Sequence, residues 1–209
     1  MKNFLFLLVF CFLCFSSCYF GRQVPMDIRK NFGSYTGDTM DISSLINING
    51  YYVIEKNITS GYPPKPHTAY FYYMFFEDGI YLHNFSIENI NKPKEYSRWG
   101  CYTLSGDTIK TKWACIYPPL SGPPYAFELW YVVIDKNTIK EIFSKPLYKR
   151  TQQEMEYYLK NYAYKECQPA TFVPIDTLPN SDYCWLKKQK WFWANEENWK
   201  LFMEKLKNK

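Results

Sequence analysis

Three short turns between runs rich in aromatic and β-branched residues limit the folds open to this chain. Asp78-Gly79 separates residues 70–76 from residues 81–86, and Asp-Gly signals a β-hairpin because both residues tolerate positive φ angles. Gly106-Asp107 and Asp135-Lys136-Asn137 lie between further runs of the same kind. The sequence therefore predicts consecutive antiparallel strands.

Seven strands are expected in up-and-down order, and a short extended piece is expected to add an eighth. The ranges are 50–55, 70–76, 81–86, 98–104, 108–116, 125–134 and 138–143, followed by 170–174. The content of 7 Trp, 20 Tyr and 16 Phe also favours strands. The predicted fold class is mostly β, with an antiparallel meander that closes into a barrel because closure removes exposed strand edges.

The first hairpin has an expected register that follows from Asp78 and Gly79 as the two central residues of the turn. The expected cross-strand pairs are Phe76 with Tyr81, Met74 with His83 and Tyr72 with Phe85. These pairs form one continuous apolar face. The opposite face is hardly more polar.

The second hairpin has a cleaner division between its two faces. The expected pairs are Leu104 with Ile109, Tyr102 with Thr111 and Gly100 with Trp113 on one face, and Thr103 with Lys110 and Cys101 with Lys112 on the other. Cys101 therefore falls on the polar face and Cys115 on the apolar face. A disulfide between them would have to pass through the sheet, so we predict that they do not pair.

Helices are expected after the barrel, in residues 149–209. Thr151 and Glu154 form a capping box at the start of a helix over residues 151–164. Asn195 caps a last helix with an apolar stripe at helical spacing. That stripe contains Trp199, Phe202, Met203 and Leu206.

Residues 1–17 have the pattern of a removable export signal. Lys2 precedes the unbroken apolar run 4–15, and Ser16 and Ser17 are the small residues that a signal peptidase needs. The run is shorter than the roughly 20 residues that span a bilayer as a helix. Export rather than a transmembrane anchor is the prediction.

Cys18 follows these small residues directly. Phe15-Ser16-Ser17-Cys18 resembles the lipobox of bacterial lipoproteins, although Phe15 replaces the usual Leu. The resemblance implies acylation of the Cys18 thiol and attachment to a membrane of the cell envelope, with the outer membrane expected because Tyr19 is not the Asp that signals inner-membrane retention. The alternative is ordinary cleavage with Cys18 incidental. Residues 18–47 lack periodicity and are predicted to form a flexible tether.

The series of hairpins resembles the bacterial lipocalin-like lipoproteins over about residues 48–145, within a barrel domain expected at residues 48–148. The residues responsible are Gly50-Tyr51-Tyr52, where the family has Gly-x-Trp, the 76–80 turn, the 100–109 hairpin and the segment 133–139. The resemblance implies a barrel able to hold an apolar pocket. It does not name a ligand.

Two readings fit the aromatic side chains of the expected barrel. They could fill it as a solid core, or line a pocket for a small apolar molecule. The candidate pocket residues are Tyr72, Met74, Phe76, Tyr81, Phe85, Tyr102, Trp113 and Phe127.

Other classes of site have little support in the sequence. His67 and His83 lack metal-ligand spacing, and the cysteines lack Cys-x-x-Cys spacing, so no metal or cofactor is expected. No catalytic motif is found, and the net charge of +5 is too mild to indicate nucleic-acid binding. Cys167 and Cys184 are the candidate disulfide pair.

Two non-enzymatic functions are therefore expected. The first is a lipid-anchored, lipocalin-like protein that binds a small apolar ligand. The alternative is an envelope protein that contacts a glycan or another protein through exposed aromatic rings such as Tyr73 and Trp99.

Overall fold

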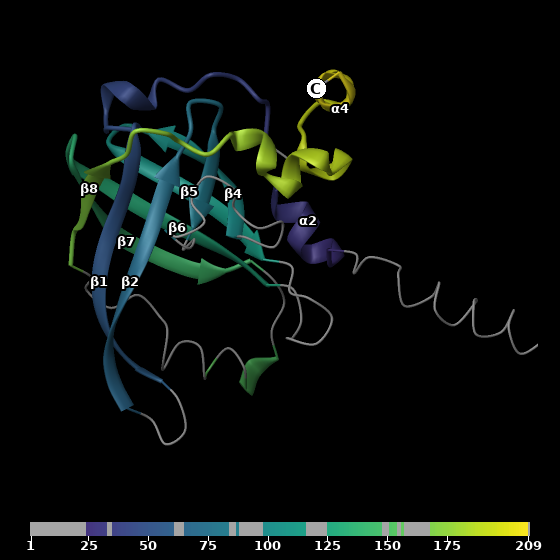
Figure 1. The fold of residues 1–209 in the computed structure, drawn as a ribbon. Coiled ribbons are helices and arrows are strands. Elements are labelled where there is room, and N and C mark those ends of the chain that lie inside the picture. The colour runs from purple at the N-terminus through teal and green to yellow at the C-terminus, as the bar shows by residue number, and fades with distance from the viewer. Residues whose placement is uncertain are drawn as a thin grey trace, which may run out of the picture.

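The chain forms a closed antiparallel barrel in which the eight strands neighbour one another in chain order (Figure 1). The computed structural model describes residues 24–32, 35–60, 65–83, 87, 98–115, 125–147, 151–153, 156 and 168–208. The strands are β1 (Gly50–Ser60), β2 (Lys65–Phe75), β3 (Ile80–His83), β4 (Arg98–Ser105), β5 (Thr108–Cys115), β6 (Tyr125–Asp135), β7 (Thr138–Pro146) and β8 (Ala170–Pro174). β8 closes the barrel by pairing with both β7 and β1. The predicted fold class is confirmed.

Within the barrel wall, alternate side chains of the strands point inward where the structure describes them, because successive side chains of a strand lie on opposite faces. The inward residues form an interior cluster that includes fully buried rings from β1, β2, β3 and β6. Its largest members are Tyr52, Tyr73, Phe75, Tyr81, Tyr102, Trp113 and Tyr131. Burial of so many rings supplies much of the apolar area that stabilises the fold.

The 3-10 helix η1 (Ile42–Ser44) covers one end of the barrel. Ile42 and Ile46 are fully buried among the interior side chains. The backbone N–H of Asn47 donates to the carbonyl of Lys136 at 2.9 Å, and the Tyr52 hydroxyl donates to the same carbonyl at 2.7 Å. We call this the η1 end, and the opposite end of the barrel the far end.

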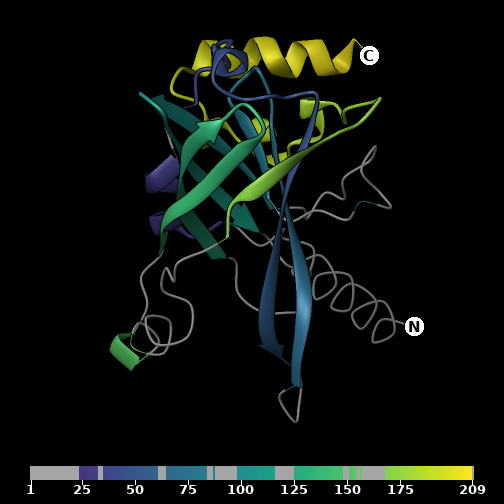
Figure 2. The ribbon, with the colours of Figure 1, turned by 90° about the vertical axis from the view of Figure 1, so that its left-hand side faces the viewer.

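A layer of helices covers the outer face of β3 and β4 (Figures 1 and 2). It consists of α2 (Met26–Phe32), η3 (Ser181–Tyr183), η4 (Trp185–Lys188), η5 (Lys190–Phe192) and α4 (Glu196–Lys207). Trp99 lies fully buried in this outer cluster. The predicted last helix is confirmed, and the Asn195 side chain caps it by accepting from the N–H of Glu197 at 2.8 Å.

The prediction of a flexible tether over residues 18–47 is wrong for the residues from 24 onward that the structure describes. Val24, Ile28 and Phe32 are buried in the outer cluster. Tyr35 stacks on Phe192 at 4.7 Å, and its carbonyl accepts from the N–H of Ala194 at 2.8 Å. Packing against the C-terminal segment, rather than helix propensity, holds so short a helix in place.

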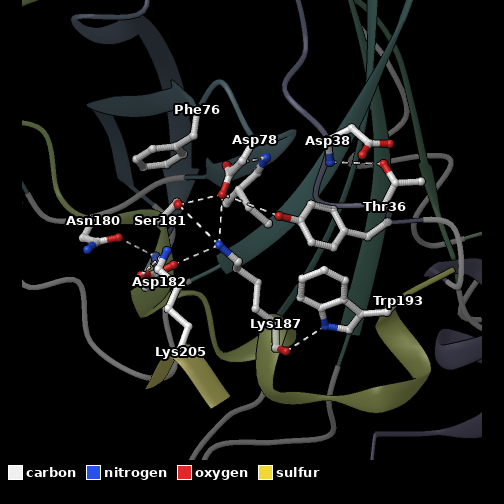
Figure 3. A network of polar contacts seen from close by, with 12 residues as sticks. Thr36, Asp38, Phe76, Asp78, Asn180, Ser181, Asp182, Lys187, Trp193 and Lys205 are labelled. Carbon is white, nitrogen blue, oxygen red and sulfur yellow. Dashed lines mark hydrogen bonds and ion pairs between the residues drawn. The ribbon is translucent and has the colours of Figure 1, made fainter. Parts of the chain in front are cut away.

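A buried ion-pair network joins this layer to the β2–β3 turn (Figure 3). The Lys187 ammonium lies 2.9 Å from Asp78 and 3.1 Å from Asp182, and its side chain is only 5% exposed. The Ser181 hydroxyl donates to Asp78 at 2.7 Å. The Lys187 ammonium also lies 4.8 Å from the ring centre of Phe202 on α4. The network therefore fixes the C-terminal segment to the barrel.

The predicted register of the first hairpin is wrong by one residue. The observed pairs are Phe75 with Tyr81, Met74 with Leu82 and Tyr73 with His83. The turn has three residues and ends at Gly79, which has a φ of 79°, as in the common hairpin whose last turn residue is left-handed. A slip of one residue moves every side chain to the other face. Tyr72, Met74 and Phe76 consequently lie outside the barrel.

The second hairpin has the predicted register in every pair, from Trp99 with Ala114 to Ser105 with Thr108. Cys101 joins the outer cluster and Cys115 the interior cluster, and neither forms a disulfide, which confirms that they do not pair with each other. Of the helix predicted over residues 151–164, Gln152, Gln153 and Glu156 are helical, and most of the remainder lies outside the described residues.

Candidate ligand-binding site

Three stacked rings mark the far end of the barrel. The His83 ring lies 4.4 Å from that of Trp113 with a 10° angle between their planes, and Trp113 lies 5.2 Å from Phe127 at 20°. The Arg98 guanidinium carbon lies 5.5 Å from the centre of the Trp113 ring, within cation–π range. These residues belong to β3, β4, β5 and β6, where each strand begins or ends away from η1. The far end thus combines largely buried aromatic rings with the side chain of Arg98.

Buried hydroxyl groups lie beside this stack. The Tyr81 hydroxyl is 2.7 Å from the hydroxyl of Tyr131 and 3.0 Å from Nδ1 of His83. Both tyrosines are fully buried, and this burial raises the pKa of each phenol well above its ordinary value of 10.0. The phenols are therefore neutral at physiological pH, and each hydroxyl keeps one proton with which to donate a hydrogen bond within this cluster.

Glu141 adds a carboxylate to the same interior. It pairs with Tyr131 across β6 and β7 and is 9% exposed. Its charge is one of the causes that raise the pKa of Tyr81 and Tyr131, after burial itself. Thr111 is also buried and donates to the carbonyl of Leu129 at 3.0 Å. Apolar walls with a few converging polar groups are the usual composition of a small-molecule site.

The structure divides the predicted pocket residues into three groups. Tyr81, Trp113 and Phe127 lie inside the barrel toward the far end. Tyr102 also points inward, but its hydroxyl donates to the carbonyl of Phe76 at 2.7 Å, beside the β2–β3 turn at the η1 end. Tyr72, Met74 and Phe76 pack on the outside, so their assignment to the pocket is wrong. Phe85 lies outside the described residues.

Sequence reasoning missed Tyr73, Phe75 and Tyr131 as interior residues. Tyr73 and Phe75 were assigned to the wrong face by the turn assumption. The Tyr81–Tyr131 contact joins residues 50 positions apart, and it forms only because β3 and β6 meet across the barrel.

The exposed aromatic surface predicted around Tyr73 and Trp99 is not formed. Tyr73 is 1% exposed inside the barrel, and Trp99 is 0% exposed beneath the helical layer. The physical reason is the register for Tyr73 and the cover of the N- and C-terminal segments for Trp99. These two rings therefore cannot contact a partner.

The buried thiols of Cys101 and Cys184 are expected to resist alkylation in the folded protein. Burial raises the pKa of each thiol from 9.0 to about 12, so the reactive thiolate is scarce at pH 8. Iodoacetamide should label both residues only after unfolding in guanidinium chloride, as read by peptide mass spectrometry. Equal labelling of native and unfolded protein would contradict this burial.

The same pKa shifts have a consequence for stability. Unfolded thiols ionise near pH 9 while the buried ones stay protonated, so their contribution to stability is complete below pH 9 and falls as the pH rises from there toward 12.

The predicted partner of Cys184, Cys167, lies outside the described residues, and so does Cys18. Because Cys184 is a free thiol, the predicted disulfide between Cys167 and Cys184 is not formed.

Among the described residues, no group of three or more His, Cys, Asp or Glu is arranged to hold a metal ion. No helix in that part of the chain is long and apolar enough to cross a membrane. No family model matches the sequence, and neither the curated proteins nor the solved structures contain a significant match.

Proposed function

We propose that this protein is an exported lipoprotein, anchored through acylated Cys18, whose barrel binds a small apolar ligand at the far end without catalysing a reaction. The observation that supports ligand binding is the difference between the two ends of the barrel. Ile42 and Ile46 fill the η1 end. The far end instead combines the Trp113 stack with buried hydroxyl groups, which suits an apolar molecule that carries one polar group.

The Trp113 stack is expected to dominate the binding of an apolar probe. In a titration of the full-length protein in detergent with N-phenyl-1-naphthylamine, Trp113→Ala should weaken binding about tenfold, because it removes the central ring of the stack. Probe fluorescence measures the affinity. Native mass spectrometry of the purified protein would reveal a co-purified ligand.

Trp130→Ala is the matched control. Trp130 lies on the outer face of β6, with its ring centre 4.6 Å from that of Phe143 and 4.6 Å from the Lys110 ammonium. Its loss removes a ring of the same size without touching the interior. Equal affinities of the two variants, or no saturable binding by the unaltered protein, would refute the ligand proposal.

A further inference from the structure

β1 has an edge that its neighbour β8 covers only in part. β1 pairs with β2 from Tyr52 to Ser60, but with β8 only from Gly50 to Val53. Beyond Val53, no strand in the described part of the chain pairs with this edge. Figure 2 shows β1 and β2 continuing as a two-stranded ribbon past the rest of the barrel.

The path of the chain before β8 explains why the pairing stops. Thr171 is the last β8 residue beside β1, and Ala170 pairs instead with Ile139 of β7. Pro169 then has no N–H with which to continue a ladder. The backbone N–H and C=O groups along such an edge are a template for another strand.

A groove lies where β1 and β8 separate. Its cavity volume is about 440 Å³, and its lining consists of Val53, Glu55, Tyr70, Gln168, Pro169 and Thr171. Tyr70 is 51% exposed, and among the aromatic rings that the structure describes only Tyr183, at 46%, is comparably exposed. Within the described part of the chain, the structure shows no hydrogen bond or ion pair for the side chains of Glu55, Tyr70 or Gln168. The polar groups of the groove are thus available to a ligand.

We propose that the β1 edge and this groove bind an extended peptide segment of a partner protein by strand addition. Val53 and Glu55 are two residues apart on the outer face of β1, so an added strand would place alternate side chains beside them. Val53 would contact an apolar side chain of the added strand. Glu55 is the charged residue of the groove lining and matches a Lys or Arg two positions along the partner strand.

The β1 edge beyond Val53, which no described strand covers, favours a peptide over a glycan. A glycan could stack on Tyr70 and bond to Glu55 and Gln168, but it would leave the row of β1 backbone groups unused. A peptide strand uses both the backbone edge and the side chains. This site lies on the outer face of the barrel wall and is independent of the interior ligand site.

A displayed library of random 12-residue peptides tests the proposal with the full-length protein in detergent. We expect the enriched peptides to carry a basic residue two positions from an apolar one. Glu55→Lys should weaken their binding by at least about tenfold, because it places like charges together. Methylation of alternate backbone nitrogens in a selected peptide should abolish binding, since it removes the donors that pair with β1.

Glu204→Lys is the matched control, because it makes the same charge change at an exposed position of α4 and should leave peptide affinity unchanged. Circular dichroism checks that both variants fold. The proposal fails if no peptide is enriched, if Glu55→Lys binds the peptides as well as Glu204→Lys, or if methylated peptides still bind. It also fails if a glycan array shows binding that the Tyr70→Ala substitution removes. It fails likewise if light scattering shows a dimer, in which a second copy of the chain would occupy this edge.

Discussion

Lys187→Ala is expected to lower the free energy of unfolding by about 3–5 kcal/mol, as for other buried ion pairs that lose one partner. The substitution removes the cation from between Asp78 and Asp182, whose side chains are only 27% and 11% exposed. The neighbouring Lys205 ammonium lies 3.4 Å from Asp182 but is 60% exposed, so it compensates poorly. For a domain of this size the melting temperature should fall by about 6–20 °C, as measured by circular dichroism.

Lys190→Ala provides the comparison, since Lys190 pairs with Glu196 at 2.6 Å but both side chains are well exposed. Water already solvates that pair, so its loss should hardly change the melting temperature. A triple variant, Lys187→Met with Asp78→Asn and Asp182→Asn, removes all three charges and should recover part of the lost stability. Equal melting temperatures for Lys187→Ala and Lys190→Ala would show that the buried network contributes nothing.

Cys18→Ser is expected to release the protein from the membrane. A hydroxyl cannot take the place of the acylated thiol, and two or more acyl chains, at about 0.8 kcal/mol per buried CH₂, would otherwise hold the protein firmly. The unaltered protein should partition into the detergent phase of Triton X-114 and incorporate labelled palmitate. The serine variant should do neither.

Cys14→Ser is the matched control, because it changes the same chemical group four residues earlier, inside the apolar run that is expected to be removed. It should leave both the mass of the mature protein and its partitioning unchanged. If the Cys18→Ser product keeps its mass and stays with the membrane, the lipoprotein proposal is wrong.

The two hairpins show how far the sequence alone can specify strand register. In the second hairpin, lysines alternate with apolar residues, and a slip would place charges in the interior, so the pattern allows one register. In the first hairpin, Tyr72, Tyr73, Met74 and Phe75 are apolar on both faces, and a slip is invisible in the pattern. There the turn alone determines the strand register. Asp78-Gly79 is compatible with the end of a three-residue turn as well as with the centre of a two-residue turn.

The candidate site and the N-terminal segment were less predictable for other reasons. The hydrogen bond between Tyr81 and Tyr131 and the ion pair between Lys187 and Asp78 join residues distant in the chain, and no local sequence pattern predicts them. In α2, Ile28 and Phe32 have helical spacing. A stripe of two residues is too short, however, to distinguish a docked helix from an irregular segment.

The docking of α2 limits how the barrel can stand on a bilayer. Six peptide units join Cys18 to the buried Val24, and at full extension they reach at most about 22 Å. An acylated Cys18 would therefore hold the flank that carries α2 close to the lipid headgroups and restrict tumbling of the whole barrel. Because β1 lies on the opposite flank from α2 in Figure 1, the part of its edge that no described strand covers would then point away from the lipid, toward the aqueous side.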